Sequence, residues 1–154
     1  MSTSIQSLII YCIVSTFSGC TTFLLCKYTK LTKVQASALP TFLFALTMLL
    51  FIDPQNRSAF CNILISIFFG ASFIGMTSSK VSSLADIFLG SILFAILYFF
   101  ADKRFHAFGG KLGIMACIAL VISIGFRRLC TFVIANLSRQ KHFVNKSVLP
   151  TIKK

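Results

Sequence analysis

Residues 84–101 read Leu-Ala-Asp-Ile-Phe-Leu-Gly-Ser-Ile-Leu-Phe-Ala-Ile-Leu-Tyr-Phe-Phe-Ala, and this stretch indicates the class of the fold. Its apolar residues form a nearly continuous run and do not alternate with polar ones, as they would in a strand of a membrane β-barrel. A helix needs about 20 mainly apolar residues to cross the hydrocarbon core of a bilayer. The stretch is therefore predicted to be a membrane-spanning helix.

Four further runs outside this stretch have the same apolar character. Three of them qualify by length: residues 8–26, 34–52 and 59–77. The last run, 112–126, is short for a span, but extending it back to residue 107 restores about 20 residues. We therefore predict an all-α, polytopic helical membrane protein with five transmembrane helices, the fifth over 107–126. An arrangement with four transmembrane helices remains open.

The composition indicates that most side chains face lipid. Of the 154 residues, 56% are hydrophobic and only 12% are charged, with a mean hydropathy of +0.89. Soluble domains carry roughly 25% charged residues. There is no glutamate, and the three acidic residues are Asp53, Asp86 and Asp102. This composition excludes an ordinary soluble enzyme and any carboxylate-rich active site.

The sequence also lacks the patterns expected of catalytic and metal sites. No two cysteines form a C-x-x-C pair, and neither histidine lies within a predicted span. No nucleophile is placed beside a base and an orienting acid, and no cluster has the spacing of metal ligands. We therefore expect no catalysis, no cofactor and no metal.

The distribution of lysine and arginine predicts the orientation, because these residues are retained on the cytoplasmic side. Five spans with the N-terminus outside place most of the 15 basic residues inside: Lys27, Lys30, Lys33, Lys80, Arg127, Arg128, Arg139, Lys141, Lys146, Lys153 and Lys154. The four others, Arg57, Lys103, Arg104 and Lys111, fall outside. The C-terminus is thus predicted to be cytoplasmic, and the short loops and basic tail suggest a bacterial inner membrane.

The chain divides into a helical bundle, 1–126, and a basic juxtamembrane tail, 127–154, which contains no acidic residue. Apolar residues at helical spacing in the tail indicate a helix lying at the membrane surface. Arg127, Arg128 and Arg139 are predicted to contact lipid phosphates. The tail has no nucleic-acid recognition motif. The expected partners are therefore membrane lipids, and no nucleic acid.

Charged groups inside a bilayer mark candidate functional positions, because each one costs about 2.5–3.5 kcal/mol at a helix centre. Asp86, near the start of the span 84–101, is such a group. Two interpretations of Asp86 are open. Its carboxylate caps the first helical turn, where the helix dipole favours negative charge, or it binds a cation or proton at the mouth of a pathway together with Lys80.

Three uncharged polar residues complete the candidate pathway. Thr21 and Thr22 belong to a hydroxyl-rich stretch of the first span, 15–23. Its hydroxyls either bond to carbonyls four residues earlier in the same helix or line a polar route. Asn62, near the start of the third span, either joins that route or bonds to a neighbouring helix.

Small residues four positions apart permit close approach of helices. The pairs are Ser66/Gly70, Ala71/Gly75, Ser91/Ala95 and Gly109/Gly113. The third span is the richest, so it is predicted to be the central packing helix. Two functions fit these features: a channel or transporter component that works as a homo-oligomer or with another membrane protein, and a non-transporting accessory, immunity or exclusion-type protein that acts by helix–helix interaction.

Overall fold

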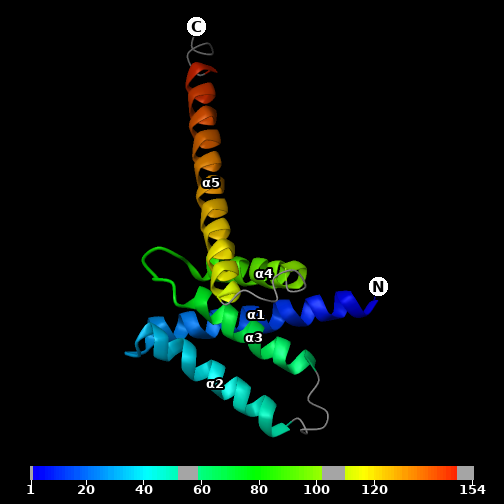
Figure 1. The fold of residues 1–154 in the computed structure, drawn as a ribbon. Coiled ribbons are helices and arrows are strands. Elements are labelled where there is room, and N and C mark those ends of the chain that lie inside the picture. The colour runs from blue at the N-terminus through cyan, green and yellow to red at the C-terminus, as the bar shows by residue number, and fades with distance from the viewer. Residues whose placement is uncertain (1, 52–58, 102–109, 149–154) are drawn as a thin grey trace. The chain divides into compact units, whose positions relative to one another are not determined.

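The computed structural model describes the backbone of residues 2–51, 59–101 and 110–148, and the side chains of residues 5–50, 60–101 and 110–136. Over these ranges the chain forms five α-helices and no strand, which confirms the all-α prediction (Figure 1). The helices are α1 (Ser2–Tyr28), α2 (Lys33–Phe51), α3 (Ala59–Gly75), α4 (Leu84–Ala101) and α5 (Lys111–Val148). Asp53, Arg57, Asp102, Lys103, Arg104 and residues 107–109 lie outside the described residues.

Within the described ranges, four helices are long and apolar enough to cross a membrane: α1, α2, α4 and α5. The apolar part of α3, Phe60–Gly75, is shorter. The lengths of the apolar runs predicted that the last helix would be the short one. In the structure the short helix is the third, α3. The last helix is long because it continues through Arg127 and Arg128. Arginine is a good helix former, and its long side chain can carry the charge away from an apolar helix.

The directions of the helices follow from contacts along α1. Tyr11 lies 6.1 Å from the Phe60 ring of α3 and 6.3 Å from the Tyr98 ring of α4, between ring centroids. One to two turns later on α1, Ser18 contacts Phe68 of α3 and Ser15 contacts Ser91 of α4. Residue numbers rise together along α1 and α3 but oppositely along α1 and α4. α1 is therefore parallel to α3 and antiparallel to α4.

α2 runs opposite to α3, since Ser37 contacts Ser72 and the Phe44 ring stacks on Phe68 at 4.3 Å. α2 and α4 thus share one direction, and α3 must return the chain between them. Its 17 residues span about 25 Å at a rise of about 1.5 Å per residue. Despite its length, α3 therefore returns the chain to the end of the bundle at which α4 begins.

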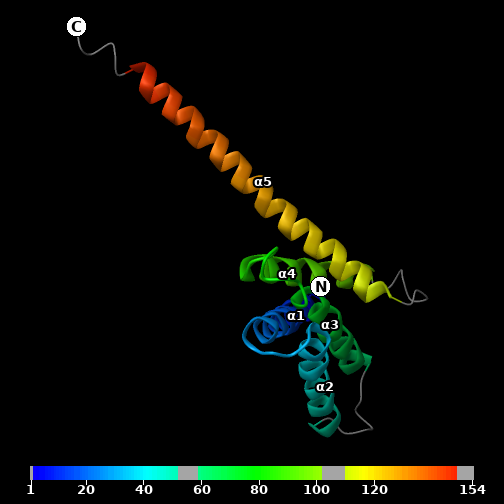
Figure 2. The same ribbon diagram turned by 90° about the vertical axis from the view of Figure 1, so that its left-hand side faces the viewer.

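The prediction that the third span is central holds in part. α3 packs against α1, α2 and α4, but α1 packs against α2, α3 and α4 and makes the more extensive contacts (Figure 2). The core between these helices includes Tyr11, Phe68, Ile74 and Phe94. α1 is therefore the helix around which the bundle is built.

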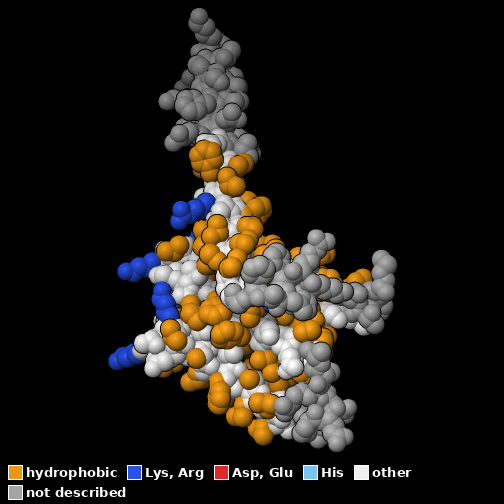
Figure 3. All heavy atoms as spheres, viewed as in Figure 1, with side chains coloured by type: hydrophobic (Ala, Val, Ile, Leu, Met, Phe, Trp, Pro, Cys, Tyr) orange, Lys and Arg blue, Asp and Glu red, His pale blue; other side chains and the backbone are white. Residues whose placement is uncertain are grey.

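The outward faces of these helices are apolar. On α1, Ile13 and Phe17 are about two-thirds exposed, and on α2 Phe42 and Leu50 are equally open. The face of the bundle drawn in Figure 3 also carries many apolar side chains. An apolar surface of this extent is suited to contact with lipid or another protein. By length and composition, α1, α2, α4 and α5 are compatible with membrane spans.

Candidate functional site

The inward face of α1 is polar, which reverses the usual arrangement of a soluble helix. Tyr11, Ser15, Ser18 and Thr22 follow one another at intervals of three or four residues, and all four are buried. This spacing places them on one side of an α-helix. α1 thus directs a line of hydroxyl groups toward α3 and α4.

Two of these hydroxyls join helices. The Ser15 Oγ donates to the Ser91 carbonyl of α4 at 2.7 Å, and the Ser18 Oγ donates to the Phe68 carbonyl of α3 at 2.6 Å. The interpretation that these hydroxyls bond to carbonyls of their own helix is thus wrong for Ser15 and Ser18, because their acceptors belong to α4 and α3. It is correct for Thr16, whose Oγ1 donates to the Cys12 carbonyl at 2.7 Å. Each interhelical bond contributes about 0.6–2 kcal/mol in a bilayer.

α1 and α3 approach each other closely at Gly19 and Gly75. A Cβ atom on Gly75 would lie 2.5 Å from the Gly19 carbonyl oxygen and 2.6 Å from the Thr22 Cβ. A Cβ on Gly19 would collide with the Ser91 Oγ of α4. The prediction of a close contact at the Ala71/Gly75 pair is therefore confirmed. Gly113 differs, because a Cβ there would meet nothing within 4 Å.

Two hydroxyls at this contact have no hydrogen-bond partner, the Thr22 Oγ1 and the Ser91 Oγ, and both residues are fully buried. Backbones this close leave no room for a water between them. These hydroxyls are therefore packed into a dry contact between helices.

Replacing Thr22 by valine is expected to stabilise the protein by about 1 kcal/mol, because valine keeps the shape and removes a buried hydroxyl that makes no bond. Ser18→Ala is the matched comparison: it removes a bond that is made, and we expect it to destabilise by about 0.6–2 kcal/mol. Unfolding of both variants by SDS titration in mild detergent measures the difference. A loss of stability in Thr22→Val would show that its hydroxyl is bonded.

A second hydroxyl link joins α2 to α3. The Ser37 and Ser72 Oγ atoms lie 2.8 Å apart, and Ser72 also donates to the Phe69 carbonyl at 2.7 Å. Sequence reasoning missed this pair. Neither residue stands in a hydroxyl-rich stretch, and the available signal was only that each follows an alanine in an otherwise apolar helix.

Asp86 is fully buried in the first turn of α4. Its Oδ2 accepts from the Ser83 N at 2.7 Å and from the Ser83 Oγ at 3.0 Å, and its own N donates to the Ser83 Oγ at 3.4 Å. This reciprocal pairing is a capping box at the helix start, and the Asp86 N also donates to the Ser83 carbonyl at 3.0 Å. The capping interpretation of Asp86 is confirmed.

The remaining candidate residues are not brought together. Thr21 is half-buried, while Lys80 and Asn62 are exposed. Asn62 lies near the start of α3 and Lys80 lies beyond its end, so a helix length separates them. Arg127 and Arg128 are exposed on α5. The side chain of Arg139 lies outside the described residues.

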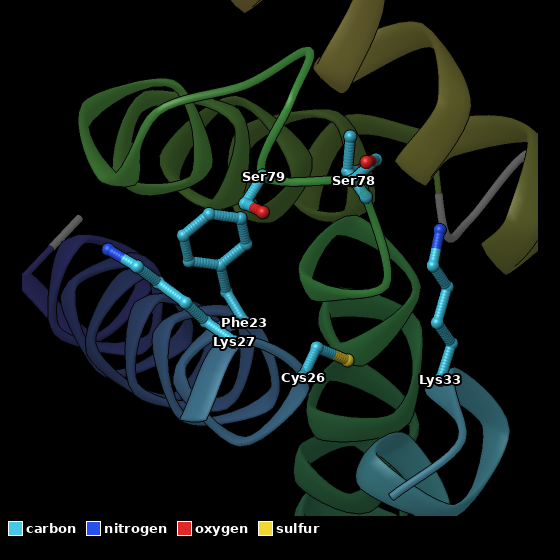
Figure 4. Close-up of a pocket in the computed structure, with 7 residues that line it drawn as sticks. Phe23, Cys26, Lys27, Lys33, Ser78 and Ser79 are labelled. Carbon is cyan, nitrogen blue, oxygen red and sulfur yellow. The ribbon is translucent and has the colours of Figure 1, made fainter. Parts of the chain in front are cut away.

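A small hollow of about 90 Å³ opens where α1 ends, α2 begins and α3 ends (Figure 4). It is lined by Phe23, Cys26, Lys27, Lys33, Thr77, Ser78 and Ser79. Two of these side chains are cationic and three carry hydroxyls. Sequence reasoning assigned Lys27 and Lys33 only to orientation, because the meeting of these three segments is a tertiary feature.

No protein-family model, curated protein or solved structure matches this chain.

Proposed function

We propose that this protein is a non-transporting membrane subunit that acts by contacts of its helices with another integral membrane protein. The observation that carries the proposal is the dry contact at Gly19 and Gly75. The buried hydroxyls of α1 hold α3 and α4 or are packed against them. Ser15 and Ser18, in the hydroxyl-rich stretch that was one candidate for a polar route, thus bond to neighbouring helices.

The partner-binding face is assigned to the first turns of α5. Gly113, Ile114, Cys117 and Ile118 are exposed there, and the two small residues stand four positions apart. Small residues at this spacing let a partner helix approach closely. Because a Cβ on Gly113 meets nothing within 4 Å, this position is open to an incoming helix.

Native mass spectrometry of the protein, extracted from its own membrane in mild detergent, tests this function. We expect one foreign membrane subunit at a fixed ratio, and loss of that subunit in Gly113→Leu with unchanged thermal stability. Leu43→Ala, on the exposed face of α2, is the control and should keep the subunit. A homo-oligomer that conducts ions after purification would overturn the proposal.

A channel or transporter component is the second candidate, and the burial of Asp86 favours it. A carboxylate that is fully buried in a membrane helix is a candidate for ion or proton binding, even where it also caps a helix. In this function, copies or partners assemble and a route passes along the capped end of α4, with Lys80 near its mouth.

Asp86→Asn separates the two functions. In a transport component, ion flux into proteoliposomes should fall about tenfold or more, as the loss of a charge from a buried site implies, while assembly stays normal. Ser83→Ala, which removes the cap but keeps the carboxylate, is the control for helix stability. Equal flux in wild type and Asp86→Asn would remove Asp86 from any pathway.

The orientation proposed is N-terminus outside and C-terminus cytoplasmic, in a bacterial inner membrane. Antiparallel packing supports it, because the connections α1–α2 and α3–α4 share one end of the bundle. That end carries Lys27, Lys30, Lys33 and Lys80. Basic residues clustered at one end are retained on the cytoplasmic side.

A further inference from the structure

The hollow at the lysine-bearing end of the bundle has the chemistry of an anion site. Its lining offers two ammonium groups, Lys27 and Lys33, and the hydroxyls of Ser78 and Ser79, while the Thr77 Oγ1 already donates to the Ile74 carbonyl. Its volume of about 90 Å³ is several times the space of about 10–15 Å³ that one water requires. An anion with several oxygens can therefore be held by several donors at once.

The side chains are arranged around the hollow from different elements. Figure 4 shows Lys27 and Lys33 on opposite sides, with Phe23, Cys26, Ser78 and Ser79 between them. The Lys27 Nζ lies 5.2 Å from the centre of the Tyr28 ring. A lysine has a flexible four-carbon stem, so this ammonium exchanges a weak contact with the ring for a bound anion without a change in the backbone.

The charge around the hollow is positive, and the described residues place no acidic side chain at the surface there. Lys30 and Lys80 lie at the same end and are exposed. Asp86 is the sole acidic residue among those described, and it is fully buried beside Ser83. A concentration of positive charge with little opposing charge raises the local concentration of anions.

The location of the hollow indicates which kind of anion it would bind. It lies at the C-terminal end of α1, and the neighbouring Leu24, Tyr28 and Val34 are exposed. Apolar side chains next to cations and hydroxyls match the boundary between lipid tails and headgroups. We propose that this hollow binds the phosphate of an anionic phospholipid, with Lys27 and Lys33 as its charged contacts. The proposal is independent of the function proposed above.

The test is retention of lipid by the full-length protein. The protein is reconstituted in nanodiscs of phosphatidylglycerol and phosphatidylcholine, returned to mild detergent, and its bound lipids are counted by native mass spectrometry. Lys27→Gln/Lys33→Gln should lose phosphatidylglycerol. Lys30→Gln/Lys80→Gln is the matched control, because it removes the same charge from the same end without altering the lining of the hollow.

We expect retained phosphatidylglycerol to fall about tenfold further in the hollow variant than in the control, since each lost lysine contact weakens binding several-fold. Lys27→Arg/Lys33→Arg should retain it. Equal losses in the two glutamine variants would mean diffuse attraction by the whole basic end and would overturn the site. No loss in either variant would overturn it as well. All four lysines are exposed, so none of these changes disturbs the core.

A second readout separates lipid from free phosphate. The Cys26 side chain lines the hollow, so its reaction with a water-soluble maleimide reports occupancy once the exposed Cys117 and Cys130 are replaced by serine. Phosphatidylglycerol should slow this reaction and inorganic phosphate in phosphatidylcholine should not. Protection by inorganic phosphate alone, without retained phosphatidylglycerol, would overturn a lipid as the ligand.

Discussion

Gly75→Ala is expected to destabilise the bundle by about 2–3 kcal/mol, at the upper end of what one added methyl group does in a packed interior. The new Cβ would lie 2.5 Å from the Gly19 carbonyl oxygen, 2.6 Å from the Thr22 Cβ and 3.0 Å from the Phe23 backbone nitrogen. Two of these three atoms belong to backbone, so no side-chain rotation relieves the contact. α1 and α3 have to separate, and the Ser18 bond to Phe68 weakens with them.

The measurement is the SDS concentration at which the helical signal of the detergent-solubilised protein is lost. Gly113→Ala is the control, because its Cβ meets nothing within 4 Å and alanine favours a helix over glycine by about 1 kcal/mol. We expect Gly113→Ala to be neutral or stabilising. If Gly75→Ala matched it, α1 and α3 would not approach each other at Gly75 in the membrane.

The second large effect is expected where α3 meets α4. A Cβ on Gly70 would collide with the ring of Phe94, and that ring is fully buried. Gly70→Ala should therefore destabilise by about 1–3 kcal/mol. Phe94→Leu should also destabilise by about 1–3 kcal/mol, because it leaves a cavity above Gly70.

Together the two changes should be less harmful than their sum by about 1–3 kcal/mol, since the shorter leucine makes room for the new methyl group. The same SDS titration applied to both single variants and the double variant gives this coupling. Phe94→Leu combined with Gly113→Ala is the control, and these two changes should be additive. Additivity between Gly70→Ala and Phe94→Leu would contradict the contact.

Most of the architecture could be predicted from the sequence, because the length and composition of an apolar run indicate whether a helix is surrounded by lipid or by water. The runs near 8–26, 34–52, 59–77 and 84–101 all correspond to helices. The length of the last helix could not be predicted from its apolar run. Arg127 and Arg128 end the run, but charge at the surface of a helix does not end the helix.

The candidate site was only partly predictable. The Ser83-x-x-Asp86 spacing is local, so the capping interpretation of Asp86 needed no tertiary information. The partners of Ser15 and Ser18 are carbonyls of α4 and α3 that lie more than forty positions away in the chain. A serine in an apolar helix has the same local pattern whether it bonds to its own helix or to a neighbour.

By itself the sequence determined the all-helical class, the span-like runs and the basic residues of the loops, and it offered a helix cap as one of two interpretations of Asp86, because each depends on residues near one another in the chain. Only the tertiary structure decided that α1 is the hub, that Gly19 and Gly75 meet, and that Lys27 and Lys33 share a hollow with Ser78 and Ser79. The physical reason is that close helix contacts depend on which faces meet, and predominantly apolar helices have several faces of similar hydrophobicity.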